Sequence, residues 1–470
     1  MHRCHPIATT ESMRKTSGLL IALSLLGLQA CSMLPVRPPL STAAAAVPSR
    51  PALHGVKGPM APQARQRVLA QLAAEGKADL SSRHLALLTQ AGSLPFYTGN
   101  QARLLIDGPA TFAAMFAELE QARSSILLET YILEDQGLAQ RLAELLLRKE
   151  AQGVKTHVLY DALGSVATAT AYFDALRAGG VAVCAFNPVN PLTRPGHWDL
   201  TQRDHRKILV VDGAVAFVGG INISEVYASG SFGRRKSRSA ERGWRDTQVQ
   251  LRGPAVLALD TLVREAWSAQ GCGSLPGPAA APASTAAGTQ VIQIIPSGAD
   301  GNEARMYAAL LTAIDGAQRS VHLTMGYFAP GADMIAALTE AAQRGVDVVL
   351  ILPSMSDFAP VLHAGRSHYE VLLQAGVKLH ELQGAVLHAK TAVIDGVFST
   401  VGSSNMDWRS FVGNNEINAV MIGDDFGQEM EAMFRRDLAA SAPVTLAQWQ
   451  ARPWLQRAKE QAARLLESWW

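Results

Sequence analysis

The feature that most constrains the fold is one short motif that occurs in two separate parts of the chain. HRKILVVDGAVAFVGGIN begins at His205, and HAKTAVIDGVFSTVGSSN begins at His388. A single copy is typical of ordinary structural residues on a strand, whereas two identically spaced copies indicate an internal duplication. His, Lys, Asp, Gly and Asn recur 183 residues apart: His205 and His388, Lys207 and Lys390, Asp212 and Asp395, Gly219 and Gly402, and Asn222 and Asn405.

The sequence before each motif repeats as well. SSILLETYILED and RSVHLTMGYFAP are apolar segments that each follow a helical pattern, GVKTHVLYD corresponds to GVDVVLILP, and GGVAVCAF corresponds to AGVKLHEL. Apolar runs that alternate with helices are typical of buried parallel strands. We therefore predict an α/β fold of two similar α/β/α sandwich domains, related by a pseudo-twofold axis and sharing one active site.

The spacing inside the motif predicts where its side chains lie. His and Lys two residues apart on a strand project from the same face, so both can reach one phosphate group. Asp-Gly between two β-prone runs is a strong signal for a tight hairpin turn. The chain then folds back, which leaves Asp212 and Asp395 at the far end of each hairpin, in a turn or support role.

The returning strand of each hairpin brings small and amide side chains toward the histidine. A small residue lets the backbone approach a ligand closely. We therefore expect four residues to bind or support a phosphate: Gly220 opposite His205, Ser403 opposite His388, and Asn222 and Asn405 near the His and Lys ends.

These segments resemble the phospholipase D superfamily, whose signature is a doubled HxKxxxxD followed by a Gly-rich turn and Asn. Both copies are complete, within a region of similarity from about residue 100 to 440. Inside that superfamily the chain is most similar to bacterial cardiolipin synthases, on SILLETYIL, HRKILVVDG, FVGGIN, WRDT, LHAKTAVIDG, VGSSNMDWRS and NNEINAV. The resemblance implies phospholipase D-type domains and a catalytic set of His205, Lys207, Asp212, His388, Lys390 and Asp395.

The WRDT and NNE segments supply one acidic residue in each half, Asp246 and Glu416. The resemblance implies that such an acid hydrogen-bonds a catalytic histidine and fixes its orientation. Asp246 has the alternative of pairing with Arg242 or Arg245 on a loop. No CxxC pair or Cys/His cluster occurs, so we expect neither a metal site nor a cofactor.

The mechanism that the resemblance implies uses both motif copies on one phosphate. One histidine attacks phosphorus to form a phosphohistidine, and the other protonates the leaving alcohol and then activates the acceptor. Lys207, Lys390 and the two asparagines would hold the phosphoryl oxygens. Family analogy favours His205 as the nucleophile, although the symmetric sequence does not distinguish the roles.

The function predicted first is a cardiolipin synthase-type phosphatidyltransferase that acts on phosphatidylglycerol or a related phospholipid. A phospholipase D hydrolase that releases phosphatidic acid comes second, because the two differ only in the acceptor. A secreted, metal-independent nuclease and a non-catalytic binding scaffold remain as further alternatives. The 42 basic and 40 acidic residues leave a net charge of +2, so we expect no nucleic acid partner.

The start of the chain is typical of an export signal. Met13 and two basic residues precede the apolar run GLLIALSLLGLQA, and Leu-Gln-Ala-Cys31 resembles the lipobox of bacterial lipoproteins. A non-lipidated signal or an uncleaved anchor is the alternative, and translation could start at Met1 or Met13. Ser32 after the cysteine resembles the pattern sorted to an outer membrane, which predicts a periplasm-facing lipoprotein. Common cardiolipin synthases begin instead with two transmembrane helices.

Composition predicts the division of the chain. We expect a signal peptide at 1–30, a Pro/Ala-rich tether at 31–61, a helical extension at 62–100, the first domain at 101–272, a linker at 273–288, the second domain at 289–440 and an amphipathic C-terminal helix at 441–470. The apolar stripe of that helix fits a membrane surface or the enzyme body equally well. Cys184 and Cys272 form either a disulfide or two free thiols. The sequence does not indicate an oligomeric state.

Overall fold

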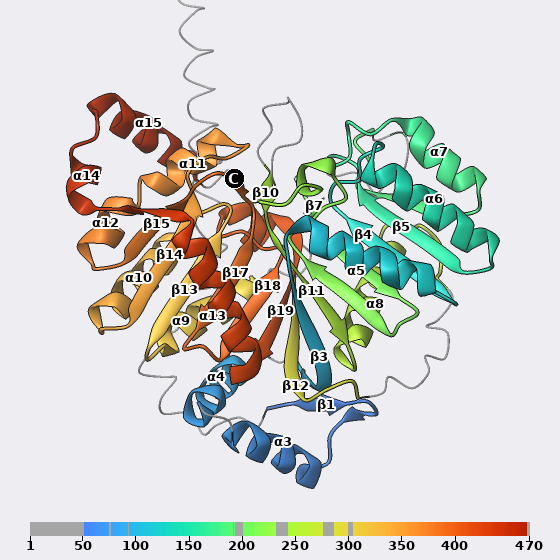
Figure 1. The fold of residues 1–470 in the computed structure, drawn as a ribbon, viewed down its shortest axis with the longest axis horizontal. Coiled ribbons are helices and arrows are strands. Elements are labelled where there is room, and N and C mark those ends of the chain that lie inside the picture. Colours follow the sequence, from blue (N-terminus) through green and yellow to red (C-terminus); the bar gives the residue numbers. More distant parts are fainter. Residues whose placement is uncertain are drawn as a thin grey trace, which may run out of the picture.

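The computed structural model describes residues 51–74, 77–92, 94–190, 192, 201–231, 243–275, 286–298 and 304–467. Two α/β halves with the same topology lie side by side (Figure 1). The predicted fold class is therefore confirmed. Residues 1–50, which contain the predicted signal and Cys31, lie outside the described part of the chain.

The first half is built on a mixed sheet with helices on both faces. Helices α5 (Asp107–Gln121), α6 (Leu138–Ala151) and α7 (Thr170–Ala178) cover one face, and α8 (Ala255–Ala269) covers the other. Strands β4, β5 and β6 run parallel, and the remaining neighbours pair antiparallel. The strand order is β6 (Ala182–Phe186), β5 (Lys155–Asp161), β4 (Ser125–Thr130), β8 (Ile208–Val211), β9 (Val215–Gly219), β11 (Thr247–Arg252) and β3 (Phe96–Ile106).

The second half repeats this sheet strand for strand. Its order is β15 (Lys378–Leu382), β14 (Asp347–Pro353), β13 (Ser320–Met325), β17 (Lys390–Ile394), β18 (Phe398–Gly402), β19 (Asn414–Ile422) and β12 (Gln290–Ser297). One face carries α9 (Arg305–Gly316), α10 (Ala332–Gln343) and α12 (Tyr369–Gln374), and the other carries α13 (Asp424–Ala439). Helix α11 (Ala359–Arg366) follows β14.

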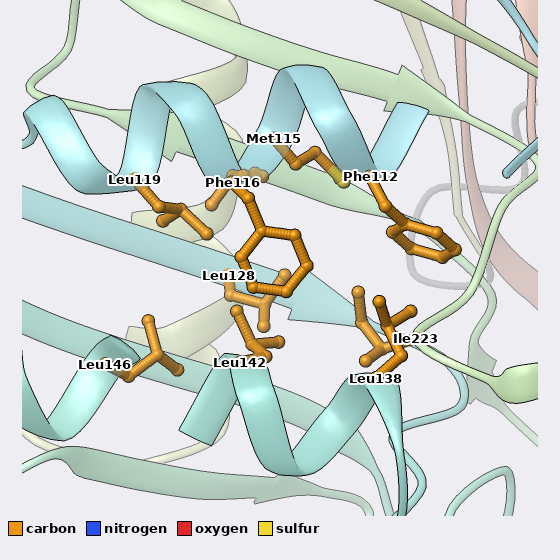
Figure 2. Close-up of a pocket in the computed structure, with 10 residues that line it drawn as sticks. Phe112, Met115, Phe116, Leu119, Leu128, Leu138, Leu142, Leu146 and Ile223 are labelled. Carbon is orange, nitrogen blue, oxygen red and sulfur yellow. The ribbon is translucent and has the colours of Figure 1, made fainter. Parts of the chain in front are cut away.

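Apolar side chains between α5, α6 and β4 show how tightly the first half is packed. Phe112 and Phe116 of α5 point toward Leu138 and Leu142 of α6, above Leu128 of β4 (Figure 2). The space left between them is about 10 Å³. A volume of that size holds at most one water molecule, so this region is core rather than a ligand site.

One apolar cluster spans both halves. Strands β3 and β12 pair antiparallel across the junction. Val218 and Val249 of the first half are fully buried in one cluster with Val401 and Ala419 of the second half. Two short parallel pairings also cross between the halves: β7 (Arg203–Asp204) with β19, and β10 (Trp244–Arg245) with β16 (Val386–Leu387). Each motif histidine therefore follows a strand that is bonded to the other half.

The structure differs from the predicted division of the chain in three places. The last residues of the expected tether form β1 (Leu53–Gly55) and β2 (Gly58–Pro59), and β1 pairs with β3. The expected boundary at residue 100 falls inside β3. The C-terminal region is not one helix but β20 (Ser441–Val444), which pairs with β15, then α14 (Leu446–Gln450) and α15 (Trp454–Arg464). Composition failed here because single apolar residues such as Leu53, which is 3% exposed, join a distant sheet.

Two further predictions have an outcome. The helical extension contains α3 (Pro62–Ala74) and α4 (Ala78–Ala91), as expected. Cys184 on β6 and Cys272 after α8 form a disulfide with a Cα–Cα distance of 6.0 Å, so the two-thiol alternative is wrong. Among the helices that the structure describes, none is both long enough and apolar enough to cross a membrane.

Candidate active site

Each motif copy folds as a β-hairpin, as its Asp-Gly pair predicts. Asp212 and Asp395 both adopt a φ of 54°, which is the left-handed region common in tight turns. Val211 pairs with Val215 in the first hairpin, so three residues rather than two form the turn. The second hairpin has the same turn. The predicted register, with a small residue directly opposite each histidine, is therefore one residue out.

The turn aspartates tie each hairpin to the start of a parallel strand. Asp212 accepts hydrogen bonds from the backbone N–H groups of residues 123–125, at 2.7–2.9 Å. Asp395 does the same with residues 318–320 and also bonds His84 at 3.0 Å. Partial burial acts to raise the pKa of each carboxyl, but these hydrogen bonds hold both below their usual value. Both aspartates thus lie at the end of the hairpin away from the histidine, where a support role was expected.

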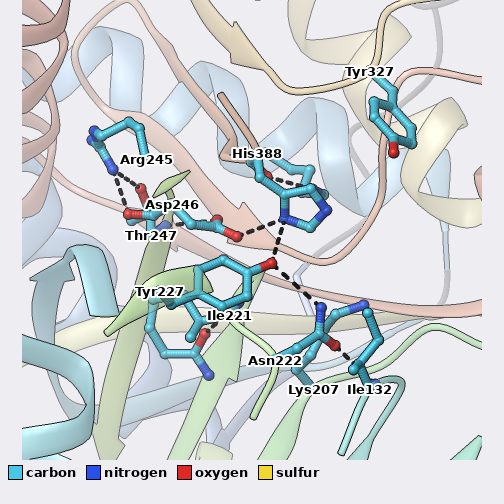
Figure 3. Close-up of polar contacts among 12 residues, drawn as sticks. Ile132, Lys207, Ile221, Asn222, Tyr227, Arg245, Asp246, Thr247, Tyr327 and His388 are labelled. Carbon is cyan, nitrogen blue, oxygen red and sulfur yellow. Dashed lines mark hydrogen bonds and ion pairs between the residues drawn. The ribbon is translucent and has the colours of Figure 1, made fainter. Parts of the chain in front are cut away.

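The motif histidines are oriented by carboxylates from opposite halves. His205 Nδ1 lies 3.0 Å and 3.1 Å from the two carboxylate oxygens of Glu416. His388 Nδ1 lies 2.7 Å from Asp246 Oδ2 (Figure 3). The β7–β19 and β10–β16 pairings cause this exchange, because each brings an acid from one half beside the histidine of the other. The structure therefore places both predicted acids on histidines.

The alternative of an Asp246–arginine pair does not hold for the described residues. The Arg245 guanidinium forms an ion pair with Asp437 at 2.7 Å and bonds the backbone carbonyl of Asp246, not its carboxylate. The Asp246 carboxylate instead accepts from the Thr247 N–H as well as bonding His388. Arg242 lies outside the described residues.

The small residues of the returning strands contact the acids. A Cβ atom at Gly220 would collide with the Asp246 carboxylate, so glycine leaves the room that this acid occupies. At the equivalent position, the Ser403 hydroxyl donates a 2.5 Å hydrogen bond to Glu416 Oε2. Both residues thus help to position the acid that orients a histidine. The sequence instead predicts that they face a phosphate.

The motif lysines are buried beside the histidines and tyrosines. Lys207 and Lys390 each donate to the backbone carbonyl of the histidine two residues earlier. The Lys207 ammonium lies 5.1 Å from the ring centre of Tyr131, and that of Lys390 lies 6.0 Å from Tyr327. Burial lowers the pKa of Lys207 to about 7 and that of Lys390 to about 8.

The two copies act on each other electrostatically. Burial lowers the pKa of His205 most, and the charges of Lys207, Lys390 and His388 lower it further. Burial raises the pKa of Glu416 to about 7, although the charge of Lys207 opposes that shift. Charges from both halves therefore converge on one buried site.

The predicted asparagines have different surroundings. Asn222 Oδ1 accepts from the Ile132 N–H at 3.1 Å, and its Nδ2 donates to the Tyr227 hydroxyl at 3.4 Å. Asn405 is buried, and its side-chain oxygen has no hydrogen-bond partner within the described residues. The Asn405 oxygen is therefore the one that an incoming donor group could meet.

Three tyrosines at this site were not predicted from the sequence. The Tyr131 ring contacts the His205 ring edge-on, at 4.9 Å between centres, and Tyr327 lies 6.2 Å from His388. The Tyr227 hydroxyl lies 3.1 Å from His388 Nδ1 (Figure 3). The repeat could have indicated Tyr131 and Tyr327, because each follows the equivalent strand of its half. When the two segments are aligned, however, the two tyrosines are offset by one residue.

Comparison with known proteins is consistent with this geometry. The family model described as "Cardiolipin synthase, PLD-like domain" matches 115–231 and 310–438, one segment in each half. The cardiolipin synthase of Geobacillus thermodenitrificans is 36% identical over 390 residues, which covers 81% of this chain and 75% of that protein. Cardiolipin synthase A of Pseudomonas putida is 36% identical over 385 residues, covering 81% of this chain and 77% of that protein.

A solved structure shows the same fold. The phosphatidylserine synthase of Haemophilus influenzae superimposes with a TM-score of 0.58 at 12% identity, covering 82% of this chain and 99% of that protein. At this identity the likeness concerns the fold alone. The family model matches both halves, and the two synthases are each 36% identical over 81% of this chain. This chain therefore belongs to the cardiolipin synthase family of phospholipase D-like proteins.

Proposed function

We propose that this enzyme is a cardiolipin synthase-type phosphatidyltransferase, which moves a phosphatidyl group from phosphatidylglycerol or a related phospholipid to an alcohol acceptor. The observation that carries the proposal is the crossed arrangement of two buried histidines, each bonded through Nδ1 to a carboxylate from the other half. Such a bond keeps the proton on Nδ1 and leaves Nε2 to react. The family relationship supports a phospholipid as the substrate.

The proposed reaction has two steps. The Nε2 atom of His205 attacks phosphorus, the bond to the leaving glycerol oxygen breaks, and His388 donates the proton that this oxygen needs. The phosphatidyl group is then bound to His205 Nε2 as a phosphohistidine. His388, now neutral, takes the proton of the acceptor hydroxyl as that oxygen attacks phosphorus and releases His205.

The lysines supply charge stabilisation in both steps. The ammonium groups of Lys207 and Lys390 would neutralise the phosphoryl oxygens, where negative charge builds up during attack. Asn405 would donate to the same oxygens through its amide nitrogen, while Asn222 is braced against Tyr227. A phosphodiester carries negative charge, so its binding would favour the protonated form of both lysines.

Product analysis tests the proposal directly. Purified protein incubated with phosphatidylglycerol should yield cardiolipin and glycerol. Phosphatidic acid and glycerol in place of cardiolipin would identify a hydrolase with the same site. Cleavage of DNA without action on lipid would replace the lipid substrate altogether.

Histidine variants test the shared site. We expect His205→Ala and His388→Ala each to lower kcat by about 10⁴-fold or more, because nucleophile and acid act as a unit. With radiolabelled lipid and an acid-quenched reaction, the wild-type protein should carry label and His205→Ala should not. Label on the His205→Ala protein would show that His388 is the nucleophile. Near-normal turnover by either variant would refute the shared site.

We also propose that the enzyme is exported and anchored by lipid on Cys31 to a periplasm-facing membrane, with Ser32 favouring the outer membrane. The Cys184–Cys272 disulfide supports an oxidising compartment. Metabolic labelling with a fatty acid should mark the wild-type protein, and Cys31→Ser should lose the label. A Cys31→Ser protein that keeps the label would contradict the assignment.

A further inference from the structure

Large apolar side chains that remain exposed are concentrated on one edge of the molecule. Val166, Leu192 and Phe358 lie in the loops that follow β5, β6 and β14, and they are 66%, 85% and 40% exposed. On α15 and just after it, Trp454 is 77% and Leu465 is 83% exposed. Leu455 and Leu466 are exposed beside them. We call these seven residues the apolar rim.

The apolar rim lies on the edge of the molecule that carries the active site. The parallel strands of each half end at the same edge. Strand β4 lies next to β5 and is followed by Tyr131, whose ring contacts His205. Strand β13 lies next to β14 and is followed by Tyr327, whose ring lies beside His388. Helices α7 and α15 lie on this edge, and α3 and β1 lie on the opposite edge (Figure 1). Val166 and Leu192 belong to the first half and the other rim residues to the second, so the rim flanks the site on both sides.

Helix α15 is held in place by its small and acidic residues. Ala463 packs on the apolar cluster of α11, which also includes Tyr327. Glu460 is fully buried and pairs with Arg452 at 2.8 Å. The carboxylate of Glu467 pairs with His368 at 2.9 Å. The helix therefore docks through the face that an amphipathic helix usually exposes, and its large apolar residues point outward.

Exposed basic side chains border the outward apolar face of α15. Both acids of this region are engaged in ion pairs with the enzyme body, whereas its other charged side chains are exposed: Arg457, Lys459 and Arg464. Apolar side chains combined with surrounding cations are the composition of surfaces that bind anionic lipid. A protein partner would instead need a continuous, complementary patch of about 800 Å². The rim consists of separate loop tips and one helix.

We infer that the apolar rim and the basic residues of α15 form a membrane-docking face, which seats the mouth of the active site on a bilayer that contains anionic phospholipid. The inference deepens the proposed function, since it rests on a phospholipid substrate. Docking in this orientation brings headgroups to the edge where the histidines lie. It also gives the outward Trp and Leu side chains of α15 an apolar environment.

Vesicle sedimentation tests the docking face in a Cys31→Ser background, where no lipid anchor contributes. The probe is vesicles of phosphatidylcholine with or without phosphatidylglycerol. The variant Trp454→Ser/Leu455→Ser/Leu465→Ser should bind the mixed vesicles about tenfold or more weakly, because three large apolar groups no longer insert. Val166→Ser/Leu192→Ser/Phe358→Ser should weaken binding in the same direction.

A matched control uses exposed apolar residues at the opposite edge. Val56 lies in the β1–β2 turn and is 37% exposed, and Leu257 at the start of α8 is 53% exposed. Val56→Ser/Leu257→Ser should leave vesicle binding unchanged. Equal loss in this control, or wild-type binding by both rim variants, would overturn the docking face.

Two further readouts separate docking from chemistry and from other partners. Turnover of a short-chain phosphatidylglycerol dispersed as monomers should be unchanged in the rim variants, because the histidines are untouched. Vesicle binding without turnover of any phospholipid would refute the proposed function and leave the docking face standing. Self-association that the rim variants abolish, in a protein that does not bind vesicles, would assign the rim to a second copy of the chain.

Discussion

The two histidine sites carry the same motif on the same backbone but differ in the side chains that support them. His388 contacts Asp246 at 2.7 Å and also the Tyr227 hydroxyl. His205 contacts both oxygens of Glu416 at 3.0 Å and 3.1 Å, and no tyrosine hydroxyl is bonded to it within the described residues. Duplication thus preserved the geometry, while the surrounding residues diverged. The two histidines therefore have distinct surroundings, as the distinct roles proposed for them would suggest.

The divergence can be followed at single positions. Tyr227 follows Asn222 by as many residues as Ser410 follows Asn405, so these two are equivalent in the repeat. Tyr227 contacts the histidine of the other half, whereas the Ser410 hydroxyl accepts from the Asn405 N–H. Likewise Gly220 makes room for Asp246, and Ser403 donates to Glu416. The comparison predicts unequal effects of equivalent substitutions.

The largest difference should appear when each acid is replaced by its amide. We expect Asp246→Asn to lower kcat by about 10³-fold and Glu416→Gln by about 10²-fold, because an amide no longer stabilises the charged imidazole. Glu416 should matter less, since burial raises its pKa to about 7 and it is partly protonated at neutral pH. Steady-state rates with phosphatidylglycerol in mixed micelles give both values. Equal losses, or a larger loss in Glu416→Gln, would show that the two sites are equivalent.

The pH dependence should follow the two buried lysines. A lysine is charged below its pKa, so raising the pH through about 7 for Lys207 and about 8 for Lys390 removes the charges that bind phosphate. We therefore expect kcat/KM to fall over this window by up to about tenfold per pH unit. The alkaline limb of kcat should lie at higher pH, because bound phosphodiester keeps the lysines protonated. A kcat/KM profile that stays flat from pH 6 to 9 would contradict these shifts, and Lys207→Arg should move the limb upward.

The smallest effect should come from the tyrosine that only one site has. Tyr227→Phe removes the hydroxyl near His388 Nδ1 and the partner of Asn222, and we expect kcat to fall by about tenfold or less, the worth of one hydrogen bond. Ser410→Ala is the matched change in the other copy and should leave the pH profile of the His388 step unaltered. Equal changes in the two pH profiles would mean that the tyrosine does not act through His388.

The sequence by itself determined the repeated units and the local geometry of the motif. The 183-residue repeat, the β-hairpins and the turn position of Asp212 and Asp395 follow from alternation and turn chemistry, which act between residues close in the chain. The doubled motif also indicated which histidines and lysines lie together. One local detail was missed, because Asp-Gly can begin a three-residue turn as well as a two-residue turn.

The tertiary structure decided which groups meet. The exchange of Asp246 and Glu416 between halves, the contact of Gly220 and Ser403 with these acids, and the Cys184–Cys272 bond all join residues more than ten positions apart. The strands that pair between the halves select the exchange of Asp246 and Glu416, whereas strand pairing and packing within one half bring the other partners together. Residue spacing carries no record of either kind of contact. The outward apolar face of α15 has the same origin, since amphipathic periodicity defines two faces and only packing on α11 decides which one remains exposed.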